Sequence, residues 1–303
     1  MSFNNRREYL FVYSVKDANP NGDPLAANHP RYDDENGVVL VSDVRIKRTV
    51  RDQWLRDGKG VFVDGEAKTL KQRIDELKKE YGVKTGGEAL SHCLDTRLFG
   101  VTFALNKKES FSWTGPVQFK WGRSIHKAAV MMVQGTAAFA TKESSEQRSF
   151  RNEYIVPFAL IADYGIANQY SSLKTGATDE DLEALFEALW KGTYNLITRS
   201  KIGHTPRFLV EVKYIDGFNG AIGAMDEKIS LKGADKETLS SDEQMAIRGC
   251  DGITLDITKL CQALARIRDN IESVRIIKDA DLSVSDLGEV KSLLGGSLTV
   301  EER

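Results

Sequence analysis

The chain has 303 residues, a formal net charge of −2 and a hydrophobic content of 41%, values typical of a globular protein with one large domain or two smaller ones. It has no run of about 18 apolar residues and no secretory signal pattern, so we expect a cytoplasmic protein that spans no membrane. The three cysteines have no CxxC spacing, which argues against a disulfide framework and a structural zinc site.

The charges are unevenly distributed along this nearly neutral chain. Residues 97–151 contain nine Lys or Arg and three acids, whereas residues 225–303 contain eleven basic and sixteen acidic residues. A basic middle and an acidic C-terminal part permit a surface that binds a polyanion, and also head-to-tail self-association. The alternative is that the charges mix again when the chain folds.

The first predicted element is a buried strand over Glu8–Lys16, which is rich in Tyr, Phe and Val. The sequence NPNGDP at Asn19–Pro24 ends it, because its prolines cannot donate to a β-ladder and Asn21-Gly22 favours a turn with positive φ. An irregular loop over Leu25–Val39 follows. The strand therefore leads into a loop of fixed shape.

A basic helix is predicted over residues 43–55, with Ser42 as its N-cap. We expect the apolar residues Val44, Ile46, Val50, Trp54 and Leu55 to point inward. The rim then carries five cations, which are Arg45, Lys47, Arg48, Arg51 and Arg56. Several cations beside a rigid loop are what phosphate binding needs, and the alternative is an ordinary solvated helix face.

Two further elements are predicted before the middle of the chain. Apolar residues at spacings of four, three and four predict an amphipathic helix over Ala67–Tyr81. A strand is predicted over Phe111–Trp121, interrupted by a bulge or edge feature at Gly115-Pro116.

A long protruding hairpin is predicted around the polar tip Thr141–Asn152, with a strand over Tyr154–Tyr164 in its second arm. Met132 lies on its first arm, and Arg148 and Arg151 lie near its tip. Apolar groups of this kind can enter between bases while arginines hold the backbone of a nucleic acid. The alternative is ordinary packing of the hairpin on a neighbouring subunit.

The last predicted elements complete a recognisable order. Thr178 with Asp181 three residues later predicts the start of a helix. A strand over Phe208–Ile215, a helix over Asp256–Ile271 and a strand over Val274–Ile277 follow. The strong elements up to residue 215 have the order βαββαβ, which predicts an α+β, ferredoxin-like (RRM-like) fold with large insertions. This fold has many functions and therefore decides none.

No catalytic motif is visible, since the chain lacks a P-loop, HExxH and GxSxG. Four carboxylates of the N-terminal loops, Asp17, Asp23, Asp33 and Asp34, are candidates for a metal site because hard cations prefer oxygen ligands. Local hydrogen bonds to the backbone of turns are the simpler explanation. We therefore expect no metal and no cofactor.

Five motifs in order resemble the Cas-seven (Cas7) family, the backbone subunits of the type I CRISPR interference complex, Cascade, with the subtype I-B and I-C branch the most similar. The resemblance covers most of residues 8–215. Its motifs are NPNGDP, LVSDVRIKRTVRD, DTRLFG (Asp95–Gly100), TGPVQFKWGRSIHK (Thr114–Lys127) and NEYIVPFAL (Asn152–Leu160).

This resemblance implies a single RRM-like domain over residues 1–303, with a finger insertion near 57–110, a thumb hairpin near 128–154 and a C-terminal elaboration over 217–303. It implies that several copies stack along a CRISPR RNA and leave its bases free to pair with target DNA. The other implied partners are the large subunit and the Cas-five-type and Cas-six-type proteins of Cascade.

The resemblance also assigns a non-catalytic RNA-binding role to particular residues. Ser42, Lys47, Arg48 and Arg51 match the family's guide-binding helix, and Asn19, Asn21 and Gly22 lie in the matching loop. The full predicted set adds Arg45, Arg123, Lys127, Met132, Arg148 and Arg151. The alternative is a metal-dependent endoribonuclease that uses a loop aspartate, as in type III backbone subunits.

Overall fold

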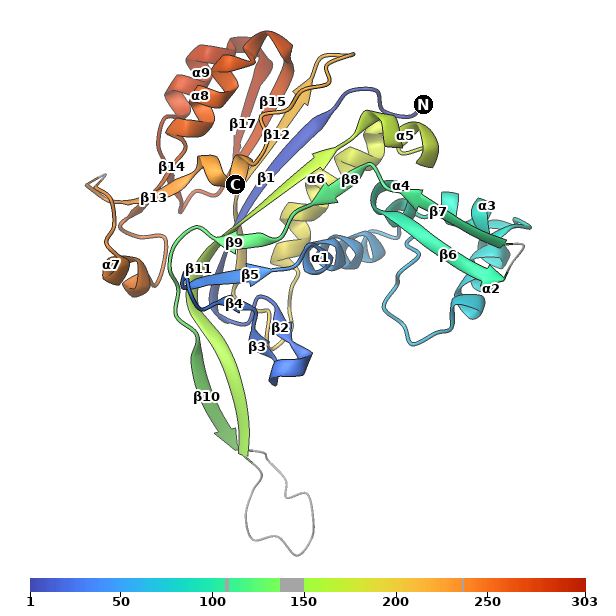
Figure 1. The fold of residues 1–303 in the computed structure, drawn as a ribbon, viewed down its shortest axis with the longest axis horizontal. Helices are drawn as coiled ribbons and strands as arrows, with labels where there is room; N and C mark the ends of the chain where they lie inside the picture. Colours follow the sequence, from blue (N-terminus) through green and yellow to red (C-terminus); the bar gives the residue numbers. More distant parts are fainter. Residues whose placement is uncertain (107–108, 137–149, 236) are drawn as a thin grey trace, which may run out of the picture.

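A computed structural model describes the chain except residues 107–108, 137–149 and 236. Its main feature is a large mixed sheet with the strand order β17-β15-β12-β1-β11-β9-β5-β4, in which β8 and β10 also pair with β11 (Figure 1). The sheet strands are β1 (Arg7–Ala18), β4 (Tyr32–Asp33), β5 (Val38–Val41), β8 (Val117–Phe119), β9 (Gly122–Ser124), β10 (Met131–Thr136), β11 (Phe150–Ala167), β12 (His204–Tyr214), β15 (Ile271–Lys278) and β17 (Leu298–Glu302).

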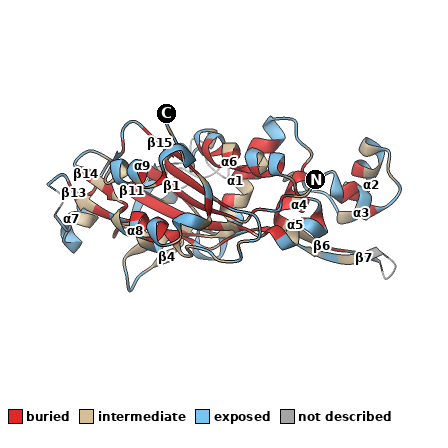
Figure 2. Ribbon diagram, turned by 90° about the horizontal axis from the view of Figure 1, so that it is seen from above, coloured by how far each residue is buried: buried red, intermediate tan, exposed pale blue. Residues whose placement is uncertain are grey.

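Strand β1 lies at the centre of this sheet and is antiparallel to both of its neighbours, β11 and β12. Nine consecutive residues from Arg7 to Val15 are buried. Such a continuous buried run means that both faces of the strand are covered. Buried residues are concentrated along these central strands (Figure 2). The predicted strand over Glu8–Lys16 is confirmed.

Two helices, α1 (Asp43–Arg56) and α6 (Asp179–Tyr194), pack on one face of the sheet. They meet Tyr9, Phe11 and Tyr13 of β1 in one hydrophobic core. The start of α6 is fixed by the predicted capping box, in which Thr178 Oγ1 accepts from Asp181 N and Asp181 accepts from Thr178 N. Both predicted helices are therefore confirmed.

The predicted inward face of α1 is wrong at two positions. Val44 and Leu55 are 63% and 36% exposed, whereas Thr49 and Gln53 are buried with Ile46, Val50 and Trp54. This face of α1 packs against α6, and Gln53 Oε1 accepts at 2.7 Å from Nδ2 of Asn195, the C-cap residue of α6. The buried stripe thus includes two polar side chains with partners, since Thr49 Oγ1 donates to Arg45 O on α1 itself.

The C-terminal part of the chain covers the opposite face of the sheet. Its own elements are β13 (Ser230–Gly233), α7 (Ser241–Ala246), β14 (Ile253–Asp256), α8 (Thr258–Arg266), β16 (Ser283–Val284) and α9 (Leu287–Leu294). They pack on Leu10 and Val12 of β1 in a second core. The helix predicted over Asp256–Ile271 is shorter than expected, because residues 268–270 form a 3-10 turn and Ile271 begins β15.

A third, small core lies beside the sheet (Figure 1). It is formed by α2 (Leu70–Tyr81), α3 (Gly86–Ser91), β6 (Gly100–Asn106) and β7 (Glu109–Thr114), with α4 (Leu94–Phe99) leading into β6. The strand predicted over Phe111–Trp121 is split between this unit and the main sheet. Gly115 lies at the split, where an added Cβ would come within 2.1 Å of the carbonyl carbon of Phe99.

The remaining described elements are short. The loop after β1 contains β2 (Gly22–Asp23) and β3 (His29–Pro30), and α5 (Gln169–Thr175) follows β11. The predicted irregular loop over Leu25–Val39 is thus partly ordered into short strands. Among the described residues, no helix is long and apolar enough to cross a membrane.

Candidate nucleic-acid interface

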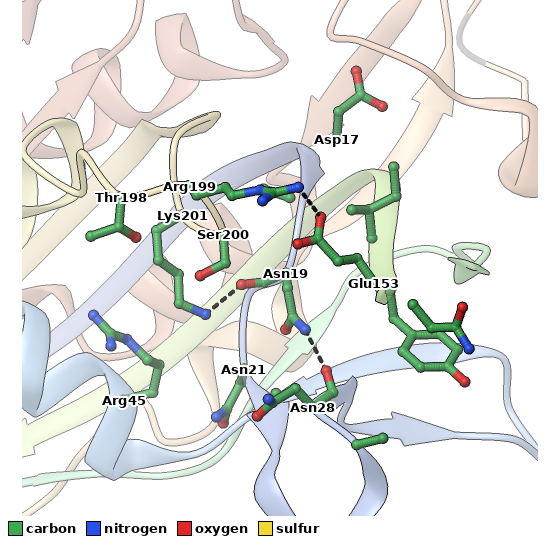
Figure 3. Close-up of a pocket in the computed structure, with 16 residues that line it drawn as sticks. Asp17, Asn19, Asn21, Asn28, Arg45, Glu153, Thr198, Arg199, Ser200 and Lys201 are labelled. Carbon is green, nitrogen blue, oxygen red and sulfur yellow. Dashed lines mark hydrogen bonds and ion pairs between the residues drawn. The ribbon is translucent and has the colours of Figure 1, made fainter. Parts of the chain in front are cut away.

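A cavity of about 640 Å³ lies where the end of β1, the NPNGDP loop, the start of α1 and the base of the β10–β11 hairpin meet (Figure 3). We call it the cationic cavity. Four residues of the predicted RNA-binding set line it, namely Asn19, Asn21, Gly22 and Arg45. The segment Thr198–Lys201, which the sequence did not single out, forms another part of its wall.

The NPNGDP loop is fixed in place by hydrogen bonds from its two asparagines. Asn19 Nδ2 donates to Asn28 O at 2.6 Å, which holds the loop closed on itself. Asn21 Oδ1 accepts from Ser42 N at 2.8 Å, which joins the loop to the start of α1. Ser42 is the N-cap residue, as predicted, but its side chain makes no capping hydrogen bond. The Asn21 side chain therefore accepts the hydrogen bond of the N-cap backbone N–H, at the point where α1 begins.

The segment Thr198–Lys201 is held against the end of β1 by its backbone. Asn19 N donates to Ser200 O at 2.9 Å, and Lys16 N donates to Gly203 O at 3.0 Å. Gly203 has a φ of +104°, and an added Cβ would lie 2.3 Å from Lys16 O. Only glycine allows this approach, so the fold brings Lys201 under the NPNGDP loop.

Lys201 and Arg45 are the cations that give the cavity its character. The Lys201 ammonium donates to Asn19 O and to Pro20 O, the latter at 3.0 Å, and Arg45 Nη2 donates to Thr49 Oγ1 at 2.9 Å. Among the described residues, neither cation forms an ion pair with a carboxylate. Burial lowers the pKa of both groups, that of Lys201 to about 7 with a smaller contribution from Arg45. Cations with uncompensated charge in a partly desolvated cavity attract anions.

Three other predicted cations of α1, namely Lys47, Arg48 and Arg51, have acidic partners. Lys47 Nζ lies 2.9 Å from Asp43 Oδ2, and Arg48 Nη2 lies 2.7 Å from Asp52 Oδ1. Both are (i, i+4) pairs, but the Lys47 side chain is only 12% exposed and lies over the Phe99 ring, whereas that of Arg48 is 37% exposed. A partly exposed (i, i+4) pair contributes about 0.3–0.5 kcal/mol, so a phosphate can replace Asp52 at Arg48 at little cost.

Arg51 is different because its partner is fully buried. Arg51 Nε lies 2.8 Å from Asp95 Oδ2, and the Asp95 side chain is 0% exposed. Asp95 also accepts from Phe62 N at 2.7 Å and from Val63 N at 3.1 Å. The first residue of the DTRLFG motif thus ties α1 to the segment before α2, and Arg51 is committed to that contact.

The remaining predicted residues lie outside the lining of the cationic cavity. Arg123 pairs with Asp33 at 3.2 Å, and the Lys127 backbone N–H donates to Gln244 Oε1 at 3.0 Å. Met132 is 58% exposed on β10. Arg151 belongs to β11, opposite Gly135 of β10, and Arg148 lies outside the described residues. Figure 1 shows that β10 and the first half of β11 extend away from the sheet.

The loop aspartates are separated rather than gathered. Asp23 caps a short turn by accepting from Leu25 N at 3.1 Å, and Asp33 accepts from Asn36 N at 3.2 Å. Hydrogen bonds from Asn36 and the Arg123 guanidinium lower the pKa of Asp33. Asp17 lines the cavity with a φ of +49°, and Asp34 is exposed. Within the described part of the chain, no group of three or more His, Cys, Asp or Glu residues is placed to hold a metal ion.

Comparisons with known proteins agree with the resemblance noted in the sequence. The sequence profile of the family described as "CRISPR-associated protein Cas7" matches residues 5–258. A CRISPR-associated protein Cas7 from Haloferax volcanii is 28% identical over 94% of this chain and 90% of its own length. Among solved structures, a chain of a "CRISPR RNA-guided surveillance complex, pre-nicking" is similar in fold, with a TM-score of 0.54 and 14% identity over 96% of this chain and all of that one.

Proposed function

This chain belongs to the family of CRISPR-associated protein Cas7, and on this premise we propose that it is a non-catalytic backbone subunit of a type I CRISPR interference complex. Several copies assemble along a CRISPR RNA in the cytoplasm and present the bases of that RNA to target DNA. The other subunits of the complex, which are the large subunit and the Cas-five-type and Cas-six-type proteins, bind the ends or sides of this assembly.

The observation that carries this proposal is the cationic cavity at the rim of the sheet. Lys201 and Arg45 line it without an ion-pair partner among the described residues, and Lys47 and Arg48, each paired with an acid one turn away, lie further along α1. Cations and fixed backbone groups hold phosphates without reading the bases. This is the chemistry that a subunit needs when base pairing supplies the specificity.

We further propose that the central part of the sheet is a ferredoxin-like palm. The order β12-β1-β11-β8 with antiparallel neighbours supports it, since these strands are the fourth, first, third and second of a βαββαβ unit. In this scheme the small unit of α2, α3, β6 and β7 is the finger, and the β10–β11 hairpin is the thumb. The C-terminal elaboration covers the second face of the palm.

One observation favours the alternative of an endoribonuclease. Asp17 lines the cavity with a positive φ, a backbone conformation that is unfavourable for most residues and is found at some active sites. Metal-dependent cleavage of a complementary RNA that is lost on Asp17→Ala would support this alternative. Intact RNA after incubation with Mg²⁺ or Mn²⁺ would support the non-catalytic role.

The experiment that tests the proposal is purification of the chain from cells that also produce a CRISPR RNA. We expect a multimer that protects RNA, measured by particle mass and nucleic-acid content. The same chain produced without a CRISPR RNA is the control for particle mass. A monomer without nucleic acid that stays monomeric when RNA is added would contradict the proposal.

A further inference from the structure

Lys201 lines the cationic cavity with two of its N–H groups already bound to backbone carbonyl oxygens. Its Nζ donates to the carbonyl oxygens of Asn19 and Pro20. A neutral primary amine has two N–H donors, whereas an ammonium group has three. The two carbonyl groups can accept from either form, and they leave the third N–H of the ammonium without a partner among the described residues.

The charged groups around Lys201 do not compensate a positive charge at its Nζ. Arg45 of α1 lines the cavity with the same sign of charge, and Asp17 at the end of β1 also lines it but forms no ion pair with Lys201. Glu153 of β11 lies 3.0 Å from Arg199. His204 at the start of β12 is buried, and this burial lowers its pKa to about 3, so that it stays neutral near pH 7. Without an anion, the free cavity therefore disfavours a fully charged lysine.

We propose that Lys201 takes up a proton from solvent when a phosphate of RNA enters the cationic cavity, so that RNA binding by this chain is coupled to pH. This inference rests on the proposed RNA-binding function. The phosphodiester keeps its single negative charge throughout, and no covalent bond changes. The phosphate oxygen accepts the third N–H of the ammonium, and its charge offsets the repulsion from Arg45. Burial brings the pKa of Lys201 in the RNA-free protein to about 7. The proton uptake on RNA binding is therefore expected near neutral pH.

The test is the pH dependence of RNA affinity, measured by fluorescence anisotropy with a labelled oligocytidylate between about pH 6.5 and 8.5. Uptake of one proton per bound protein predicts that the dissociation constant rises about tenfold per pH unit above the pKa of free Lys201. Lys201→Arg keeps a permanent positive charge and is expected to give a nearly flat profile. Lys201→Met is expected to bind weakly at every pH, and the exposed Lys191→Met on α6 is the control with the wild-type profile.

A second measurement does not depend on any variant. Calorimetric titration of the wild-type protein with RNA, in two buffers of different ionisation enthalpy, counts the protons taken up on binding. We expect close to one per protein at about pH 8, and a similar count in Lys191→Met. A count near zero, or a pH slope that persists in Lys201→Arg, would overturn the inference while RNA binding remains. Absence of RNA binding at every pH would instead contradict the proposed function itself.

Discussion

The clearest way to separate structural from ligand-binding cations on α1 is to replace Arg51 by methionine. This change removes the guanidinium 2.8 Å from Asp95 and leaves a carboxylate that is 0% exposed. Breaking a buried ion pair by removing one partner costs about 3–5 kcal/mol. Asp95 keeps its hydrogen bonds from Phe62 N and Val63 N, so we expect the lower end, about 3 kcal/mol.

The free energy of unfolding and the RNA affinity should respond differently to this change. A loss of about 3 kcal/mol lowers the melting temperature by about 6–12 °C for a large domain, which calorimetry or circular dichroism can measure. RNA affinity at a temperature where the variant is folded should stay within about twofold of wild type, because Arg51 is already committed to Asp95.

The matched control is Arg48→Met, on the preceding turn of the same helix. Its ion pair with Asp52 is a partly exposed (i, i+4) pair, so its loss costs about 0.5 kcal/mol. If Arg48 contacts phosphate, this control weakens RNA binding with little effect on melting. The reverse pattern, in which Arg51→Met has the melting temperature of the wild type but a much lower RNA affinity, would refute the assignment of Arg51 to a structural role and Arg48 to phosphate binding.

Three further predictions concern the interface and the stability of the fold. Lys47→Ala combined with Arg48→Ala should weaken RNA binding and reduce the slope of affinity against salt by about one to two; an unchanged slope would exclude this helix as a phosphate site. Deletion of Lys142–Arg151 should leave a folded protein, by melting temperature, that no longer forms ordered filaments on RNA in electron micrographs. In the wild type, the free energy of unfolding should fall by about 1.4 kcal/mol per pH unit below about pH 6.5, because histidine is protonated in the unfolded chain while the buried His204 stays neutral. His204→Gln should reduce this loss of stability. Equal acid sensitivity of the variant and the wild type would show that His204 does not contribute.

Local patterns predicted the elements that depend on local chemistry. The strand at β1, the basic helix at α1 and the capping box at Thr178 follow from apolar spacing and from residues within a few positions of each other. The same patterns misplaced Val44 and Leu55, because contact with α6 decides which face of α1 is buried. They also did not show that Gly115 divides one apparent strand between two sheets.

The candidate site was predicted less completely than the fold. The loop asparagines were predicted from the resemblance to the family, and Arg45 from the run of cations on the predicted helix. Lys201 was missed, since it reaches residues 19 and 20 only through the pairing of β12 with β1. The sequence TRSKIGH around it offered one signal, a glycine that follows two cations. Arg51 could not be distinguished from Arg48 because its partner Asp95 belongs to a separate motif.

Because both faces of the central sheet are covered, bases of a nucleic acid cannot stack on them. Many RRM domains lay two or three bases flat on aromatic rings of an open sheet face. Here Tyr9, Phe11 and Tyr13 are buried beneath α1 and α6, and the C-terminal elements cover Leu10 and Val12 on the other side. Strand β1, which would carry such aromatic rings, is covered on both faces. RNA at this sheet therefore meets loops and a hairpin. Under the proposed function, a guide held only at such edges keeps its bases unstacked from this sheet, and those bases remain free to pair with another strand.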